Sequence, residues 1–393
     1  MDAGPSTSES ADVIVIGGGP AGSATALRLA RQGMHVIQLE RRVFLAPHND
    51  RLRSGEGLIP RAGRELAALG IDMASAPWVL SHVQQLRLAW PDGTRMRESI
   101  TQYGGIVQID RERFDYELFC AACRAGVDGR EGWRARRFYR DSQGRVAGVL
   151  AQAPGGRALH AIRARVVIDA GGRNALAFRE YNLRVPDPRG DFFAMAMFFD
   201  QVADLAPGVW EMHLFDPHQL TVVQLSQLAA GLVRCGLGTT QQAQRAGSRG
   251  PQAFFWERIQ HSPELTRRLA HSRVIHRPFV RASIGYRVRQ AVFDGLLLAG
   301  DAAGYLNPLF GDGIVRALWS ARHAATTVAA GLRTGDLSRA GLQRYARLLV
   351  ARDTIDWAVK GCILRLHSYP RMLSYIGRCD PIRRALLAAL LRS

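Results

Sequence analysis

The chain contains 393 residues, of which 47% are hydrophobic and 22% charged, and this balance excludes a wholly disordered or collagen-like protein. The formal net charge of +18 favours anionic partners. Lys360 is the single lysine, however, so the arginine excess resembles a genome-wide codon bias, and we expect no nucleic-acid partner. Five scattered cysteines, no visible signal peptide and no long apolar run predict a cytoplasmic protein without a transmembrane segment.

The most informative pattern lies near the N-terminus. Residues 11–16 form a short β-branched run typical of a buried parallel strand, and the small residues 23–30 suit a helix. Between them, Gly17, Gly19 and Gly22 have the G-x-G-x-x-G spacing. Those glycines permit a tight turn, close approach to a pyrophosphate and close helix–strand packing. The segment therefore predicts a dinucleotide site.

A second strand predicted over residues 34–39 ends at Glu40. A carboxylate there can accept hydrogen bonds from the ribose hydroxyls of adenosine, and it disfavours a 2′-phosphate. The pattern therefore indicates FAD or NAD rather than NADP in this site.

A later strand–turn–helix separates these two cofactors. Residues 293–304 end in Gly300–Asp301, and a helix is expected over 315–321. Here the chain resembles the FAD-dependent monooxygenase and halogenase superfamily, which shares the p-hydroxybenzoate hydroxylase architecture. The resemblance implies that Asp301 contacts the ribityl chain of FAD and that the helix directs its N-terminus at the flavin pyrimidine, where its partial positive charge stabilises anionic reduced flavin.

Two intermediate segments extend the resemblance. Residues 109–118 resemble the family's Arg-x-x-Phe-Asp segment, which implies that Arg111 lies near the flavin diphosphate, and residues 166–174 resemble its Asp-Ala-x-Gly turn. The implied fold is α/β: a Rossmann-type FAD-binding domain with a discontinuous chain, an antiparallel substrate sheet and C-terminal helices. The FAD-binding domain is expected over 11–80, 101–188 and 281–340, and the substrate domain over 81–100 and 189–280. The C-terminal helices are expected over 341–393.

The resemblance also assigns site residues. Glu56 and Asp312 are the candidates for catalysis near the flavin. The residues expected to bind the cofactor are Gly17, Gly19, Ala21, Gly22, Glu40, Arg41, Arg53, Arg111, Asp301, Gly311, Gly313 and Ile314. We expect no metal site.

Two motifs narrow the branch of the family. Residues 53–60 resemble the Gly-Glu-x-x-x-Pro segment of flavin-dependent halogenases and geranylgeranyl reductases, and Gly311–Asp312–Gly313 resembles the reductases' Gly-Glu-Gly. Halogenation is disfavoured on three grounds. The only candidate for the halogenating lysine, Lys360, lies in the C-terminal tail. The Trp-x-Trp-x-Ile-Pro signature is missing, and Asp312 would place a negative charge near the halide.

The substrate side is expected in the middle of the chain. Residues 192–199 predict a strand, and 210–215 and 220–225 predict antiparallel strands about a turn at 216–217. Family architecture would present Met195 and Met197 to the substrate, although a role as sheet core is the simpler interpretation. His213 is a weak acid–base candidate, and Cys120 and Cys123 are interpreted as structural cysteines within one helix. Basic C-terminal helices, with a break at 369–370, complete the chain.

The resulting hypothesis is an FAD-dependent monooxygenase that hydroxylates an electron-rich aromatic substrate through a flavin C4a-hydroperoxide. One specific form is hydroxylation of a tryptophan side chain of a peptide or protein client in tryptophylquinone cofactor biogenesis. The alternative is an FAD-dependent reductase of isoprenoid double bonds, resembling geranylgeranyl reductase. Since a second dinucleotide motif is missing from the sequence, either NAD(P)H visits transiently or a separate flavin reductase supplies electrons.

Overall fold

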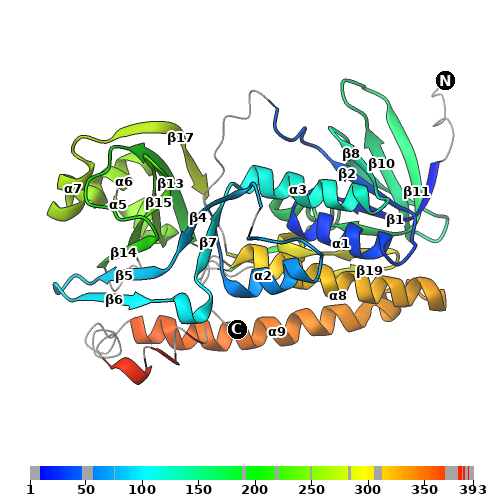
Figure 1. Cartoon of the computed structure of the whole chain (residues 1–393). Coiled ribbons are helices and arrows are strands. Elements are labelled where there is room, and N and C mark those ends of the chain that lie inside the picture. The colour runs from blue at the N-terminus through cyan, green and yellow to red at the C-terminus, as the bar shows by residue number, and fades with distance from the viewer. Residues whose placement is uncertain are drawn as a thin grey trace.

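The computed structural model describes residues 9–46, 56–74, 76–187, 192–216, 221–247, 250–281, 285–304 and 312–367, together with 379–382, 384–385 and 388 near the C-terminus. Two large sheets lie side by side. One is a mainly parallel sheet flanked by long helices, and the other is an antiparallel sheet with short helices (Figure 1). No helix in these residues is long and apolar enough to cross a membrane.

The first sheet has the order β19-β20-β11-β1-β2-β8, with β10 and β9 attached beside β11. Strand β1 pairs in parallel with both β2 and β11, and β11 pairs in parallel with β20. This confirms the predicted Rossmann-type arrangement. Its strands are β1 (Glu9–Ile16), β2 (Val36–Glu40), β8 (Asp128–Glu131), β9 (Arg134–Arg140), β10 (Val146–Gln152), β11 (Leu159–Asp169), β19 (Val292–Phe293) and β20 (Leu296–Leu298).

Alternate residues of β1 enter two different cores. Val13 and Val15 pack in a cluster with side chains of α1, α3 and α8. Ile14 packs on the opposite face with residues of β9, β10 and α4. The helices are α1 (Pro20–Ala30), α3 (Arg111–Arg124), α4 (Leu176–Tyr181), α8 (Gly313–Thr334) and α9 (Arg339–His367), the last of which runs along α8 (Figure 1). The expected helix break at 369–370 lies outside the described residues.

The second sheet has the order β17-β13-β16-β15-β14-β5-β6, and all its pairs are antiparallel except β14 with β5. The predicted antiparallel pairing of the strands at 210–215 and 220–225 is confirmed. Its strands are β5 (Gln85–Ala89), β6 (Arg95–Ser99), β13 (Phe192–Asp200), β14 (Val209–Asp216), β15 (Thr221–Ala229), β16 (Leu232–Thr240) and β17 (Arg273–Arg281).

Three short helices cover one face of this sheet: α5 (Gln241–Gly247), α6 (Pro251–Gln260) and α7 (Pro263–Leu269). Met195 and Met197 belong to the core formed with Phe254 and Phe255 of α6. The simpler interpretation of these methionines as sheet core is therefore correct. The implication of the family architecture that they face a substrate was wrong, because the helices bury the face on which they lie.

A small sheet joins the two large ones. It consists of β3 (Glu56–Leu58), β7 (Ile106–Ile109) and β4 (Val79–Val83), and α2 (Pro60–Ala67) follows β3. Gln108 of β7 donates to the hydroxyl of Ser226 on β15 at 2.7 Å. The face of the antiparallel sheet opposite α6 and α7 is therefore directed towards β3 and β7. A further pair links β12 (Arg184–Pro186) to β18 (Tyr286–Val288).

Candidate functional site

The structure shows why the turn between β1 and α1 contains three glycines. Gly17 has φ +105°, and a Cβ on it would lie 2.5 Å from the carbonyl oxygen of Ala170. A Cβ on Gly22 would lie 2.0 Å from the carbonyl oxygen of Gly17, whereas one on Gly19 would meet nothing within 4 Å. The first and third glycines therefore allow close packing, and the second leaves open space at the helix start.

Helix α1 begins at this open space. Gly19 is its N-cap, and no side chain of the described residues caps it. The first backbone N–H groups of the helix therefore need an acceptor, and the positive end of the helix dipole favours an anion there. The diphosphate of FAD has the charge and the acceptor oxygens that this cradle requires.

Glu40 lies beside the same turn, at the end of β2. Its carboxylate accepts the backbone N–H of Gly18 at 2.6 Å, and it accepts the N–H and the Nε–H of Arg42 at 2.8 and 3.1 Å. Glu40 is only 5% exposed. The carboxylate is thus held next to the glycine turn, where a ribose of the cofactor would be bound.

A chain of charges connects Glu40 to α3. The carboxylate of Asp115 lies 3.5 Å from Nη2 of Arg42 and accepts Nε–H of Arg111 at 2.8 Å. Asp115 is 3% exposed. Arg111, predicted to bind the diphosphate, is therefore oriented by the same carboxylate that holds Arg42, while Arg41 is exposed. Sequence reasoning missed Arg42 and Asp115, although Asp115 follows Arg111 by one helical turn.

The second turn follows β20 and contains Asp301. Gly300, with φ +62°, donates its N–H to the hydroxyl of Ser320 at 2.9 Å, and a Cβ on it would lie 2.8 Å from Cβ of Ala21. The hydroxyl of Tyr286 donates to the carbonyl of Asp301 at 2.8 Å. Ala21, in the first turn of α1, therefore lies beside Gly300, the residue that precedes Asp301, although the two segments are distant in the sequence.

Asp169, at the end of β11, holds the turn that follows it and the segment that leads to Asp301. Its carboxylate is fully buried and accepts the N–H groups of Gly171 and Ala177 at 3.0 and 2.8 Å, while its carbonyl accepts the N–H of Ala299 at 3.0 Å. Burial raises the pKa of Asp169 to about 6, although the backbone hydrogen bonds to its carboxylate lower it in part. Asp169 is thus a structural group within the cofactor domain.

Helix α8 begins at the third part of the predicted site. Asp312 is its N-cap residue, but its carboxylate accepts Nε–H of Arg316 at 2.9 and 3.1 Å instead of capping the helix. A Cβ on Gly313 would meet nothing within 4 Å, and Ile314 is buried in the core of the cofactor domain. The negative charge of Asp312, a candidate for catalysis, is therefore compensated by Arg316.

Three predicted residues are described only in part or not at all. Arg53 and Gly311 lie outside the described residues. The backbone of Glu56 begins β3 and pairs with Ile109. A Cβ on the neighbouring Gly57 would lie 2.6 Å from the ring of Trp210, so the Glu56 segment contacts the antiparallel sheet.

The face of the antiparallel sheet directed towards β3 and β7 has small residues at its centre. Ala194 pairs with Gly238, and Ala196 pairs with Gly236, on adjacent strands. A Cβ on Gly238 would meet nothing within 4 Å. We name this side of β13, β16, β15 and β14 the inner face.

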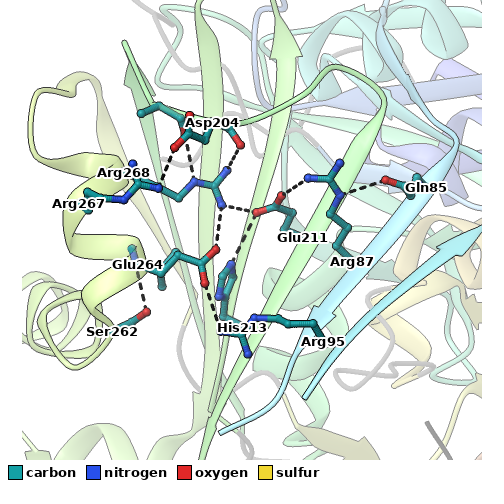
Figure 2. Close-up of polar contacts among 12 residues, drawn as sticks. Gln85, Arg87, Arg95, Asp204, Glu211, His213, Ser262, Glu264, Arg267 and Arg268 are labelled. Carbon is teal, nitrogen blue, oxygen red and sulfur yellow. Dashed lines mark hydrogen bonds and ion pairs between the residues drawn. The ribbon is translucent and has the colours of Figure 1, made fainter. Parts of the chain in front are cut away.

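His213 lies on the opposite side of this sheet. Figure 2 shows it with Glu211, whose carboxylate pairs with Arg268 of α7 and with Arg87 of β5. Burial opposes the ionised form of Glu211, but the nearby His213 and the hydrogen-bonded Arg268 outweigh it and lower the pKa to about 2. His213 is therefore part of a buried ionic network that joins α7 to the sheet, remote from the inner face.

The remaining predicted cysteines lie within α3. Cys120 and Cys123 occupy adjacent turns, and burial raises the pKa of both thiols. Across the described ranges, no group of histidine, cysteine or acidic side chains is arranged to hold a metal ion.

Comparisons with known proteins agree with this geometry. The FAD binding domain family matches residues 10–358. The chain is 27% identical to the 1H-pyrrole-2-carbonyl-(peptidyl-carrier protein) chlorinase of Pseudomonas fluorescens, over 86% of this chain and 80% of the relative. It is 29% identical to digeranylgeranylglycerophospholipid reductase 1 of Methanopyrus kandleri, over 85% and 84% of the two chains.

Solved structures share the fold. A geranylgeranyl bacteriochlorophyll reductase-like protein of Thermoplasma acidophilum superposes with a TM-score of 0.79 at 23% identity, covering 94% of this chain and 92% of that one. The flavin-dependent brominase Bmp2 superposes with a TM-score of 0.81 at 22% identity, covering 97% and 93%. The chain belongs to the FAD binding domain family, and it is an FAD-dependent oxidoreductase related to flavin-dependent halogenases and geranylgeranyl reductases.

Proposed function

We propose that the protein is an FAD-dependent monooxygenase that hydroxylates an electron-rich aromatic substrate at the inner face. The pyrrole named for the Pseudomonas fluorescens chlorinase is a ring of this class. A tryptophan side chain of a peptide or protein client is another, and it is the more specific form of the proposal. The electron donor is either NAD(P)H or a separate flavin reductase.

The observation that carries the proposal is the mixed chemistry of the inner face. The indole Nε1 of Trp210 is buried and has no hydrogen-bond partner among the described residues. Its cross-strand neighbour Ser226 is hydrogen-bonded to Gln108. An inner face that offers an indole ring and polar side chains favours an aromatic substrate with a heteroatom over a hydrocarbon chain.

Small and uncharged residues occupy the centre of the inner face. At its centre, Ala194 and Ala196 of β13 pair with Gly238 and Gly236 of β16, and the inner-face residues of β15 are Val222, Gln224 and Ser226. The imidazole of His276 and the guanidinium of Arg234 lie beside Phe198, towards one end of this face. Bound FAD supplies hydride or activated oxygen, and the protein's own residues supply position and exclusion of water. Oxygen transfer to an electron-rich ring depends chiefly on such positioning.

The second candidate is a reductase of isoprenoid double bonds. The Methanopyrus kandleri relative favours it, since that protein is named as a digeranylgeranylglycerophospholipid reductase. Saturation of a carbon–carbon double bond consumes a hydride and a proton, so it would need a proton donor near the substrate. Asp312 is the acidic residue offered by the reductase-like motif, and its carboxylate is paired with Arg316.

The deciding experiment is a single turnover of the FAD-loaded protein after reduction by dithionite without oxygen, which makes the result independent of the electron donor. We expect indole or phenol derivatives to gain one oxygen atom only after ¹⁸O₂ is admitted, with the label in the product. A polyprenyl substrate that gains two hydrogen atoms without oxygen would establish the reductase instead. A halogenated product in the presence of bromide would also contradict the proposal.

A variant localises the reaction to the inner face. Gly238→Leu fills the open space above β16, so the yield of hydroxylated product should fall at least tenfold while the flavin spectrum stays unchanged. The matched control is Gly156→Leu, in an exposed turn of the cofactor domain, which should turn over normally. Equal turnover by both variants would place the substrate elsewhere.

A further inference from the structure

A groove on the surface of the cofactor domain is unexplained by this function. It lies where α1, α2 and α8 meet and has a volume of about 210 Å³. Its lining is mainly basic and polar, and we name it the arginine groove. The residues that line it are Arg28, Arg31, Gln32, Ala68, Arg322, Ala325 and Thr326.

The arginine groove is separate from the diphosphate cradle. Arg28 lies in the last turn of α1, whereas Gly19 is its N-cap. At 1.5 Å per residue, the two positions are roughly 13 Å apart along the helix axis. An anion in the groove would therefore not be the diphosphate of FAD bound at Gly19.

Positive charge in the groove is only partly compensated. Glu65 is the single acidic residue of the three helices. Its two oxygens lie 3.5 Å from Nη2 of Arg28 and 3.4 Å from Nη2 of Arg322, so one carboxylate serves two guanidinium groups. Arg31 donates to the carbonyl of Leu69 at 3.0 Å. Three cations and one anion leave an excess of two positive charges.

Arg28 has the least favourable surroundings of the three. Its Nε is buried without a hydrogen-bond partner in the described part of the chain. Burial lowers the pKa of Arg28, repulsion from Arg322 and Arg31 lowers it further, and only Glu65 opposes them. An anion bound beside Arg28 would supply both an acceptor and the missing negative charge.

We propose that the arginine groove binds a phosphate dianion carried by a small molecule, either a phosphorylated nucleotide or a phospholipid headgroup. A phosphate monoester has close to two negative charges at neutral pH, which equals the excess in the groove. Guanidinium groups bind phosphate oxygens in paired hydrogen bonds, and three of them converge here.

The first test is titration of the FAD-loaded protein with inorganic phosphate at low ionic strength, followed by calorimetry. We expect saturable binding at one site. Arg322→Gln should weaken it about tenfold, because this half-exposed arginine can be replaced without disturbing the core. Glu65→Gln should strengthen binding, because it removes the competing carboxylate.

The matched control is Arg333→Gln, which removes the same charge from an exposed position of α8 outside the groove. It should leave phosphate binding unchanged. Absence of saturable binding, or equal weakening by Arg322→Gln and Arg333→Gln, would overturn the proposal, since the second result shows only a general effect of net charge. None of these variants alters the inner face, so the outcome is independent of the monooxygenase assay.

A competition experiment identifies the source of the phosphate. Adenosine 2′,5′-bisphosphate and vesicles of phosphatidic acid in phosphatidylcholine are each added to the phosphate-loaded protein. If the bisphosphate displaces phosphate, and does so less in the Arg322→Gln variant, the ligand is a nucleotide. If the vesicles displace phosphate, and do so less in the Arg322→Gln variant, the ligand is a lipid headgroup.

Discussion

Replacement of Glu40 provides the most direct test of the cofactor site. The carboxylate lies next to the glycine turn, and its oxygens already accept the N–H of Gly18 and the backbone and Nε hydrogens of Arg42. FAD binding would add ribose hydroxyls to the same carboxylate. Glu40→Gln keeps the shape and one acceptor oxygen, whereas Glu40→Ala removes both oxygens.

The magnitude follows from the strength of hydrogen bonds to a charged group, about 1.5–3 kcal/mol each. A free-energy loss of about 1.4 kcal/mol corresponds to a tenfold change in Kd. Glu40→Gln weakens or removes one hydrogen bond to the ribose, so it should raise the Kd for FAD roughly tenfold. Glu40→Ala removes two, so it should raise the Kd at least about a hundredfold. The assay is titration of the apoprotein with FAD, monitored by flavin fluorescence, with the apoprotein Tm measured in parallel.

The parallel measurement separates cofactor binding from stability. Asp12→Asn is the control, because it removes the same charge from β1, where Asp12 accepts the N–H of His35. It should leave the Kd for FAD unchanged. If both Glu40 variants bind FAD as tightly as the wild type while their apoprotein Tm falls, the carboxylate only supports the turn, and the ribose assignment is refuted.

Three further predictions follow from the structure. Gly19→Ala should weaken FAD binding, because the added Cβ enters the space where the diphosphate would bind, and it should change the apoprotein Tm little, because that Cβ meets no protein atom. Gly22→Ala should lower the apoprotein Tm measurably by calorimetry, because its Cβ overlaps the carbonyl oxygen of Gly17. The reverse pattern would contradict the assignment of this turn as the diphosphate cradle. Glu211→Gln should lower the free energy of unfolding by about 3 kcal/mol at neutral pH. The pKa of Glu211 is lowered from 4.5 to about 2, so its stabilisation is present above pH 4.5 and disappears as the pH falls towards 2, and urea unfolding of both proteins should converge in that window. Gly57→Ala should cost about 1–3 kcal/mol in thermal unfolding because its Cβ overlaps Trp210, and an unchanged Tm would argue against that contact.

The glycine turn illustrates what local sequence determines. A buried strand, a turn with positive φ at Gly17 and a small-residue helix are specified by adjacent residues, because the steric limits act between near neighbours. Glu40 was predictable for the same reason, since it ends the next parallel strand of the same unit. These elements were confirmed where they were expected.

The orientation of β13 could not be determined in this way. Phe192 to Phe199 are apolar on both faces, so a period of two cannot tell which face is covered, and only the packing of α6 shows that Met195 and Met197 are core. Arg268 lies 57 residues from Glu211, and their pairing required α7 to be placed over the sheet.

The sequence by itself thus determined the cofactor, because its binding elements are local and sterically strict. The tertiary structure decided how Arg42 and Arg111 share Asp115, which side of the antiparallel sheet is open, and that α1, α2 and α8 form the arginine groove. Each of these features depends on side chains from elements far apart in the chain. Their proximity follows from the packing of the whole core, which no short segment encodes.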